Sequence, residues 1–369
     1  ECLSLDEENT SGYSKEFYSA SEELRKQYKN DEEAKQIIDI ALGLEGLRRQ
    51  DGIHAAAIVI SPDTITKFLP IQQKGSNAEI VTQYEMHTVE QLGLLKMDFL
   101  GLRNLSIVDR TLELIGSESL DIDNLKLDDE KTFKLFAEGK MTGVFQLESR
   151  VAQSTSRSLK PKRFEDIVAL VALIRPGPLG AGMHNEFADR ANNRKEIEYL
   201  HSDLESILNE TYGVILYQEQ VMQIAEKIAG FNLQEADNLR VAMGKKIPKV
   251  MEEQRKKFTD GAVSNNYSEQ FAIELFDQIA YFAGYGFNKS HSVPYALLAY
   301  QTAYLKANYP AEYIAACLTA VKRDKDRTAI FLSEARDMGV KVSTPDVNLS
   351  SSDFTVNDNE ILFGLSAVR

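Results

Sequence analysis

The chain has 369 residues, 43% of them hydrophobic, and its formal net charge at pH 7 is −14. This length is enough for two or three domains with separate cores, and no run of about 18 apolar residues predicts a membrane helix. The two cysteines, Cys2 and Cys317, are too few for a disulfide framework or a thiolate zinc site, which suits a reducing cytoplasm.

The first hundred or so residues change from helical to strand patterning. Residues 14–50 carry apolar side chains at helical spacing, which predicts two amphipathic helices with Asn30 or Asp31 capping the second. Turn residues then separate short apolar runs, which predict the strands of a small sheet at 55–60, 80–82 and 94–99.

From Leu102 onward the spacing is helical again, so this region is expected to be mostly α-helix. Strands return near the end, where the turn-forming residues 357–359 join two short apolar runs. The clearest helical stretches are 163–174, 216–229, 248–263, 268–282 and 295–308, and the final strands are expected at 340–342, 354–356 and 361–363.

One carboxylate, Asp98, interrupts the apolar run 94–105, which is expected to be a buried strand that turns into a helix at Gly101. A charge in a strand core costs several kcal/mol unless it is paired, hydrogen-bonded or bound to a metal. Lys96 and Asp98 are two residues apart, so on a strand they share one face. Two interpretations stay open: a structural ion pair between them, or a cradle for a metal-bound phosphate.

Basic residues gather in two segments, although the net acidity argues against a nucleic-acid partner. Residues 149–164 contain five bases and no acid, and a second cluster lies in 240–257. A solvated helix face is the alternative interpretation of each. The cations that could contact phosphates are Arg157, Lys160, Lys162 and Arg163 in the first segment, and Arg240, Lys245 and Lys246 in the second.

Two turn segments also combine features that suit phosphate binding. Arg175 precedes a stiff Pro-Gly-Pro turn that can hold its guanidinium outward for bidentate contact, although an Arg at a helix C-terminus is the alternative. Residues 281–295 combine glycines, aromatic rings, the donors Lys289 and His291, and a helix start that favours anions. The alternative for this segment is a packed turn between two helices.

Seven motifs together identify a family. They occur in one order and at consistent spacing over nearly the whole chain, at 52–56, 96–103, 143–149, 175–179, 212–220, 242–246 and 282–291. This set resembles the α subunit of bacterial DNA polymerase III, the C-family replicative DNA polymerase.

The resemblance implies an internal fragment of a longer protein, with residues 1–52 at the end of the thumb, 53–103 as the second part of the palm, and 104–369 as the fingers. The chain begins with Glu1 rather than Met, which fits that expectation. The implied fold class is multidomain α+β and predominantly helical. A partial palm, with the nucleotidyltransferase fold of the polymerase β type, would precede a large helical fingers domain with short strands at its C-terminal end.

The resemblance also implies a DNA-directed DNA polymerase (EC 2.7.7.7). A primer 3′-OH would attack the α-phosphate of a deoxynucleoside triphosphate, two Mg²⁺ ions would stabilise the attacking and leaving oxygens, and pyrophosphate would leave. Asp98 would be a Mg²⁺ ligand, with Lys96 facing the same phosphates. The nucleotide contacts would be Arg240, Arg175, Lys245, Lys246, Lys289 and His291, and the DNA contacts Arg157, Lys160, Lys162 and Arg163.

The expected partners are primer-template DNA, deoxynucleoside triphosphates and other replisome subunits, such as the sliding clamp, through segments outside this chain. The protein would be cytoplasmic and would not bind a membrane.

Two departures from the family pattern affect this expectation. Val241 replaces the second of two arginines expected before the 242–246 motif, and residues 151–156 are polar and lack an expected glycine. They leave room for reduced activity or for a diverged, non-catalytic DNA-binding or replisome-assembly module. The family's other two metal-binding aspartates lie upstream of the thumb, so residues 1–369 alone are expected not to polymerise.

Overall fold

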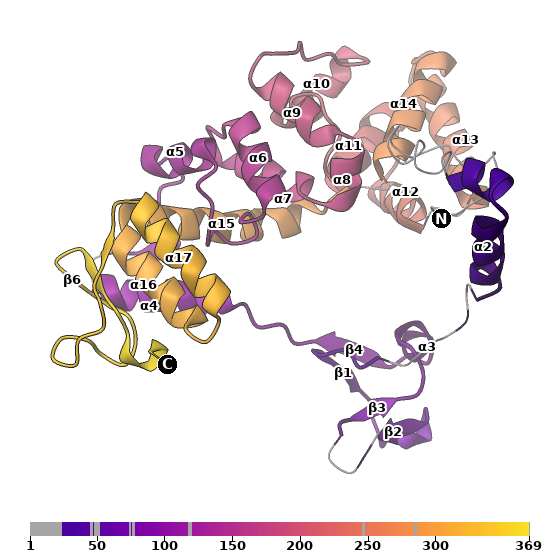
Figure 1. Cartoon of the computed structure of the whole chain (residues 1–369). Coiled ribbons are helices and arrows are strands. Elements are labelled where there is room, and N and C mark those ends of the chain that lie inside the picture. Colours follow the sequence, from indigo (N-terminus) through magenta and orange to yellow (C-terminus); the bar gives the residue numbers. More distant parts are fainter. Residues whose placement is uncertain are drawn as a thin grey trace. The chain divides into compact units, whose positions relative to one another are not determined.

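The computed structural model of the chain describes residues 24–44, 47, 52–73, 75, 78–116, 120–245, 248–283 and 286–368 (Figure 1). They divide into two compact units, and the division of the chain falls between Arg103 and Asn104. Helices dominate and strands form only small sheets, which confirms the predicted multidomain, predominantly helical α+β class. The division into thumb, palm and fingers stays a prediction.

Helix α2 (Glu32–Leu44) lies in the first unit, and residues 24–30 before it are also helical. The backbone amides of Glu33 and Ala34 donate to Asp31 Oδ1 at 3.0 and 3.2 Å, so the predicted cap is Asp31. No residue of α2 is buried. This helix therefore presents apolar as well as polar side chains to solvent.

The strands of the first unit form two separate ladders rather than the single sheet expected. Strand β1 (Ala57–Ile60) pairs antiparallel with β4 (Leu95–Asp98), and β2 (Ile71–Gln73) pairs antiparallel with β3 (Ile80–Thr82). The 3₁₀ helix η2 (Ile65–Lys67) and helix α3 (Met86–Gln91) complete this part. A small core of Leu69, Val89 and Leu94 holds it together.

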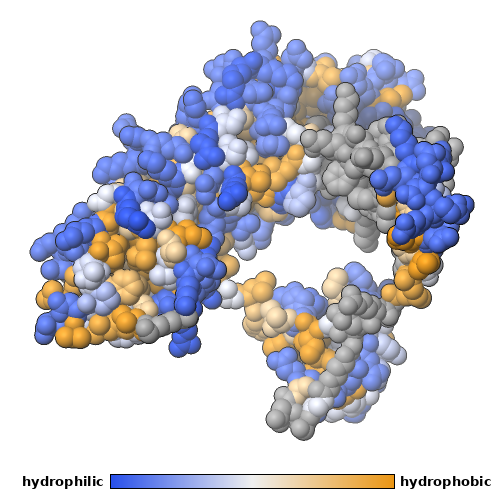
Figure 2. Space-filling model, in the orientation of Figure 1, coloured by the Kyte–Doolittle hydropathy of each residue, from blue (hydrophilic) through white to orange (hydrophobic). Residues whose placement is uncertain are grey.

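The predicted burial of the 94–99 run is wrong except at Leu94, which is buried. Val59 packs against the small core, but the cross-strand pairs Ile58 with Met97 and Ile60 with Leu95 lie on the opposite face. These four side chains are 40–55% exposed, and Figure 2 shows apolar atoms at the surface of this unit. We name this set the apolar ladder face. A continuous apolar run indicates that both strand faces can be buried, but it does not supply the covering element.

The second unit begins with helix α4 (Arg103–Ile115), whose first residue lies at the boundary, as the expected turn near Gly101 requires. No helix among the described residues is long and apolar enough to span a membrane. The further helices are α5 (Glu130–Glu138), α6 (Arg150–Leu159), α7 (Phe164–Leu173), α8 (Pro176–Gly180), α9 (Met183–Ala191), α10 (Glu205–Leu208), α11 (Gln218–Ala229), α12 (Leu233–Lys245), α13 (Pro248–Ser264), α14 (Glu269–Ala283), α15 (Lys289–Asn308), α16 (Pro310–Val321) and α17 (Lys325–Asp337), with short 3₁₀ helices η3 (Ile122–Asn124), η4 (Ser202–Leu204), η5 (Asn209–Thr211) and η6 (Leu365–Ala367).

A three-stranded sheet lies near the C-terminal end of the described residues. Its order is β5 (Lys341–Val342), β7 (Glu360–Leu362) and β6 (Thr355–Asn357), with β5 parallel and β6 antiparallel to β7. The predicted turn between the last two strands is confirmed, since Asp358 and Asn359 have φ angles of 49° and 62°. Two consecutive positive φ angles are typical of a tight hairpin, and Asp and Asn tolerate them.

Three hydrophobic cores organise the second unit. The first core joins α5, α6, α7, α9 and α15, the second joins α4, α16, α17 and the C-terminal sheet, and the third joins α10 to α14. The long helix α15 contributes Tyr300 to the first core and Leu305 to the second. The segment before α11 is shared in the same way, because Val214 and Leu216 lie in the first core and Ile215 in the third.

Candidate functional site

Lys96 and Asp98 share one face of β4, as their spacing predicts. The Lys96 Nζ lies 2.8 Å from both carboxylate oxygens of Asp98, and the His54 Nδ1 lies 3.8 Å from Oδ1. The hydrogen bond from Lys96 holds the pKa of Asp98 below its ordinary value. The Asp98 side chain is 40% exposed. The strand therefore presents an ionised, accessible carboxylate whose partner in this structure is Lys96.

This carboxylate does not make a complete metal site with its described neighbours. Magnesium prefers six oxygen ligands in a nearly octahedral arrangement. Within the described ranges, no group of three or more His, Cys, Asp or Glu side chains could hold a metal ion. Asp98 fits the donor chemistry of one Mg²⁺ ligand, and no more than that.

A second group of predicted residues lies where residues 286–291 pack on the segment that begins α11. The Phe287 amide donates to the Leu216 carbonyl at 3.1 Å, and the Gln218 amide donates to the Phe287 carbonyl at 2.9 Å. These bonds form an isolated parallel bridge between Tyr217 and Phe287. The motifs at 212–220 and 282–291, far apart in the sequence, are thus joined through their backbones.

Two glutamates occupy the donors at the start of α15. Both carboxylate oxygens of Glu219 accept from the Lys289 backbone amide, at 3.0 and 2.9 Å. The Lys289 Nζ donates to both oxygens of Glu210, at 2.9 and 2.7 Å. Asn288 caps the helix by accepting from the His291 amide at 2.9 Å. Carboxylates therefore hold the groups that the sequence suggests for phosphate.

Arg175 lies against the same segment. Its guanidinium carbon is 4.2 Å from the centroid of the Phe287 ring, and its Nε donates to the Ala172 carbonyl at 3.0 Å. Burial lowers the pKa of Arg175. The ring of His291 lies 5.4 Å from that of Phe287 and 4.2 Å from that of Tyr295. Arg175 and His291 thus both lie against Phe287, and Lys289 begins the helix that carries His291. We call Arg175, Lys289 and His291 the Phe287 cluster.

The structure describes only part of the predicted nucleotide contacts from α12. Arg240 pairs with Asp237 one turn earlier at 2.8 Å rather than with a residue of the Phe287 cluster. Lys245 is the last residue of α12, but its side chain lies outside the described residues, as does the whole of Lys246.

The basic segment 149–164 divides into exposed and anchored cations. Arg157, Lys160 and Lys162 are exposed. Arg163 instead donates to Asp166 at 3.1 Å and to the Glu210 carbonyl at 2.8 Å. Its guanidinium carbon also lies 4.9 Å from the Tyr212 ring centroid. Three of the four predicted DNA contacts are therefore open to solvent, and the fourth joins internal groups.

Sequence reasoning missed the two glutamates that anchor Lys289. Glu219 lies inside the 212–220 motif, where a carboxylate among glutamine, tyrosine and apolar residues was a usable signal. Glu210 lies just outside it, and no spacing connects it to Lys289, which is 79 residues away in the chain. Only the fold brings these two side chains together.

Known proteins match both units. The family model for the "Bacterial DNA polymerase III alpha NTPase domain" matches residues 4–101, and that for the "Bacterial DNA polymerase III alpha subunit finger domain" matches residues 104–266. DNA polymerase III subunit alpha of Thermus aquaticus is 48% identical over 356 residues, and that of Escherichia coli K12 is 46% identical over 365 residues. The chain belongs to the bacterial DNA polymerase III alpha subunit family.

The matches cover 94% of this chain and 29% of the Thermus aquaticus protein, and 95% and 32% for the Escherichia coli protein. The chain thus spans about a third of the length of these alpha subunits. Lys96 and Asp98 lie in the stretch matched by the NTPase-domain model, and Arg175 and Arg240 in the stretch matched by the finger-domain model. Lys289 and His291 lie beyond both stretches.

Proposed function

We propose that this chain is part of a replicative DNA-directed DNA polymerase (EC 2.7.7.7) that adds deoxynucleotides to a primer 3′-OH and releases pyrophosphate. The observation that carries the proposal is Asp98, an ionised and accessible carboxylate on a strand in the region matched by the NTPase-domain model. Its acting partners are primer-template DNA and deoxynucleoside triphosphates, with the sliding clamp and other replisome subunits bound through segments outside this chain. The enzyme works in the bacterial cytoplasm.

Asp98 supplies one carboxylate ligand to Mg²⁺, and the remaining protein ligands come from outside residues 1–369. When bound, two such ions stabilise negative charge on the attacking and leaving oxygens. Lys96, 2.8 Å from Asp98, balances the carboxylate charge in this structure and would face the phosphates in the enzyme. Because one carboxylate cannot hold the ions alone, the isolated chain does not extend a primer.

The Phe287 cluster binds the triphosphate in this proposal. Arg175 offers a planar guanidinium for bidentate phosphate contact, and Lys289 and His291 add donors at the start of α15. The phosphates replace the carboxylates of Glu210 and Glu219, which now hold Lys289. Arg240, Lys245 and Lys246 add further cationic contacts from α12, and the exposed Arg157, Lys160 and Lys162, with Arg163 behind them, face the DNA backbone.

Replacement of Asp98 tests the proposal in the full-length protein. Asp98→Asn should lower the rate of primer extension at least about 100-fold, because a neutral amide is a poor Mg²⁺ ligand, while primer-template affinity stays within a factor of about two. Asp109→Asn, the same change on an exposed residue of α4, is the matched control and should keep full activity.

The runner-up function is a diverged, non-catalytic module that binds DNA or assembles the replisome, and Val241 in place of an expected arginine favours it. That function requires the full-length wild type to bind primer-template DNA without extending it. Extension by the wild type that is unaffected by Asp98→Asn would overturn the assigned role of Asp98.

A further inference from the structure

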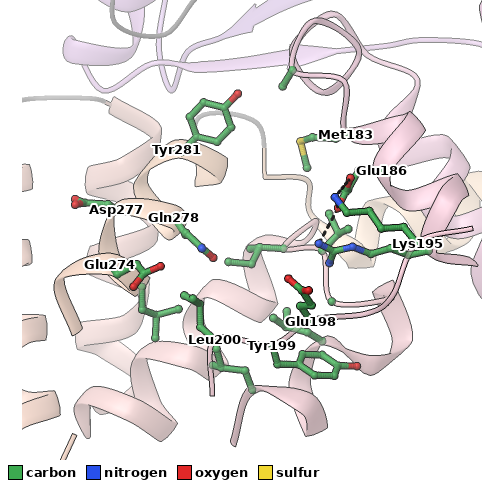
Figure 3. Close-up of a pocket in the computed structure, with 18 of the residues that line it drawn as sticks. Met183, Glu186, Lys195, Glu198, Tyr199, Leu200, Glu274, Asp277, Gln278 and Tyr281 are labelled. Atoms are coloured by element: carbon green, nitrogen blue, oxygen red, sulfur yellow. Dashed lines mark hydrogen bonds and ion pairs between the residues drawn. The ribbon is translucent and has the colours of Figure 1, made fainter. Parts of the chain in front are cut away.

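A cavity of about 960 Å³ lies in the second unit beside helices α9 and α14 (Figure 3). Cavities of roughly 300–1,000 Å³ are typical of ligand sites in proteins. None of the residues predicted from the sequence to bind nucleotide, metal or DNA lines it. The cavity therefore needs an explanation of its own.

Helices α9 and α14 and the loop between α9 and η4 supply its walls, and residues of two hydrophobic cores supply its floor. Helix α14 presents residues at three- and four-residue spacing, which place a single helix face toward the cavity. The floor is apolar, with Leu204, Leu208 and Ile215 from the third core and Met183 and Val214 from the first. The lining residues of α14 on this face are Gln270, Ile273, Glu274, Asp277, Gln278 and Tyr281, and the buried Leu275 of the same helix also lines the cavity.

The walls are acidic, and part of this charge is unpaired. Glu186 is bound by both Arg190 and Lys195 at 2.7 Å. Glu198 and Glu274, in contrast, are exposed and have no cationic partner among the residues that the structure describes. Figure 3 shows these two glutamates on opposite sides of the cavity. An apolar floor thus lies between two free negative charges.

The apolar floor and the two glutamates indicate which class of ligand the cavity can bind. Carboxylates repel phosphates, so a nucleotide or a nucleic-acid strand is unsuitable. A neutral apolar ligand leaves both glutamates without a counter-charge. Gln270 and Gln278 make no side-chain hydrogen bond among the described residues, and each offers one carbonyl acceptor and one amide donor group. A peptide backbone needs both kinds of partner.

We propose that this cavity binds a short segment of a partner protein in which an apolar side chain is flanked by lysine or arginine. The apolar side chain lies on the leucine and isoleucine floor, and the flanking cations pair with Glu198 and Glu274. The backbone of the segment exchanges hydrogen bonds with Gln270 and Gln278. The site goes beyond the proposed polymerase chemistry and does not depend on it.

The chain contains no tryptophan, so a tryptophan in a peptide reports binding directly by its fluorescence. The probe is the synthetic peptide Arg-Leu-Trp-Leu-Lys with blocked ends. With the 369-residue chain, its emission should shift to the blue and saturate. Two comparison peptides should bind at least about tenfold more weakly, one with glutamates at both ends and one with serines in place of the leucines.

Charge reversal on the protein locates the site. Glu198→Lys with Glu274→Lys should lower the affinity for the cationic probe at least about tenfold, because two charge attractions become repulsions. Glu252→Lys with Glu253→Lys makes the same charge change on exposed residues of α13 that do not line the cavity, and should change affinity less than about threefold. A benzophenone derivative of the probe should cross-link within 181–215 or 270–281.

Several results would overturn the peptide site: no saturable binding of the cationic probe, equal binding of the acidic or serine peptide, or an equal loss in both double variants. The last result would mean that the probe responds only to the overall negative charge. Matching thermal unfolding midpoints of wild type and both variants serve as the check on folding.

Discussion

At the scale of single residues, the Lys96 and Asp98 pair shows how one interaction can serve two states. Without a metal ion, the ammonium group satisfies a carboxylate that is exposed on an apolar strand. In the proposed enzyme the same ammonium would remain beside the phosphates when Asp98 binds Mg²⁺. Under that proposal, the structural ion pair and the functional interpretation are compatible rather than exclusive alternatives.

Removal of Lys96 should raise the pKa of Asp98. Its hydrogen bond is the main cause of the lowered pKa, so in Lys96→Ala the carboxyl should take up its proton at a higher pH, closer to the ordinary aspartate value. Carbon-13 NMR titration of the side-chain carboxyl measures this. Lys67→Ala, which removes the cation that lowers the pKa of Asp63, should raise the pKa of Asp63 and leave the pKa of Asp98 unchanged. An unchanged pKa of Asp98 in Lys96→Ala would contradict the conclusion that Lys96 lowers it.

Lys306 is the most buried cation described, with a side chain 1% exposed. Its Nζ donates to the carbonyls of Lys140 and Thr142 at 2.7 and 2.8 Å and pairs with Glu334 at 2.6 Å. Burial lowers the pKa of Lys306 despite this carboxylate partner. The side chain thus joins α15, α17 and the turn after α5 at one point.

Lys306→Met should lower the free energy of unfolding by about 3 kcal/mol, because it leaves a largely buried carboxylate, 13% exposed, and two carbonyls without their donor. Urea unfolding of the second unit measures the loss. Adding Glu334→Leu should recover part of it, since no unpaired buried charge then remains. Lys341→Met, which removes a largely exposed ion pair with Glu360, should cost less than about 1 kcal/mol. Equal losses in the two single variants would contradict the role given to burial.

At the scale of elements, the apolar ladder face is an exposed apolar surface of the first unit. Its side chains Ile58, Ile60, Leu95 and Met97 lie on a two-stranded ladder, and neither of its edges pairs with a further strand among the described residues. Exposed apolar strands of this kind favour pairing with another chain. The opposite face, with Val59 and Lys96, is better covered.

The 369-residue chain should therefore self-associate through this face. Ile58→Thr with Met97→Thr changes a cross-strand pair while keeping residues that favour strands, and it should shift the chain toward monomer in sedimentation velocity. Val59→Thr, on the covered face, should reduce stability without reducing self-association. Unchanged association in the double variant would show that another surface is responsible.

The same elements show what the sequence could and could not predict. Helices α7, α11, α13, α14 and α15 were predicted because their apolar residues recur at helical spacing, and β3 and β4 because short apolar runs lie between turns. Strand β2 was missed because two of its three residues are glutamine. The exposure of the β1 and β4 ladder was missed because the covering of a strand depends on other parts of the fold.

The site was predictable to the same degree. Arg175, Lys289 and His291 were predicted because their residue types and turns suit phosphate, a role that stays a prediction, and the fold places Arg175 and His291 against the Phe287 ring. Glu210 and Glu219 were not, because their partnership with Lys289 depends on a tertiary contact. Local chemistry can be read along the chain, whereas the partner of a charged side chain cannot.

At the scale of the whole molecule, a net charge of −14 and a DNA partner are compatible if the basic residues act locally. Electrostatic repulsion between exposed groups falls off over a Debye length of about 8 Å at physiological salt. Acidic residues elsewhere on the chain then weaken DNA binding only slightly. The distribution of charge decides the interaction, and the total does not.

Binding to primer-template DNA should therefore depend on salt through residues 149–164. In the full-length protein, Lys160→Ala with Lys162→Ala should reduce the magnitude of the slope of log affinity against log salt by about 1 to 2. The reason is that DNA binding releases fewer counterions when fewer phosphates are contacted. Fluorescence anisotropy at several salt concentrations measures this slope. Lys325→Ala with Lys341→Ala, an equal charge change at two exposed sites elsewhere, should leave the slope unchanged.

The segment before α11 limits how this part of the chain can change over evolution. Val214 and Leu216 belong to the first core while Ile215 belongs to the third, so neighbouring side chains serve opposite cores. Substitution by another aliphatic residue leaves this assignment intact. Insertion or deletion of a single residue exchanges the two sets and disturbs both cores at once. Related chains should therefore vary in composition here but not in length.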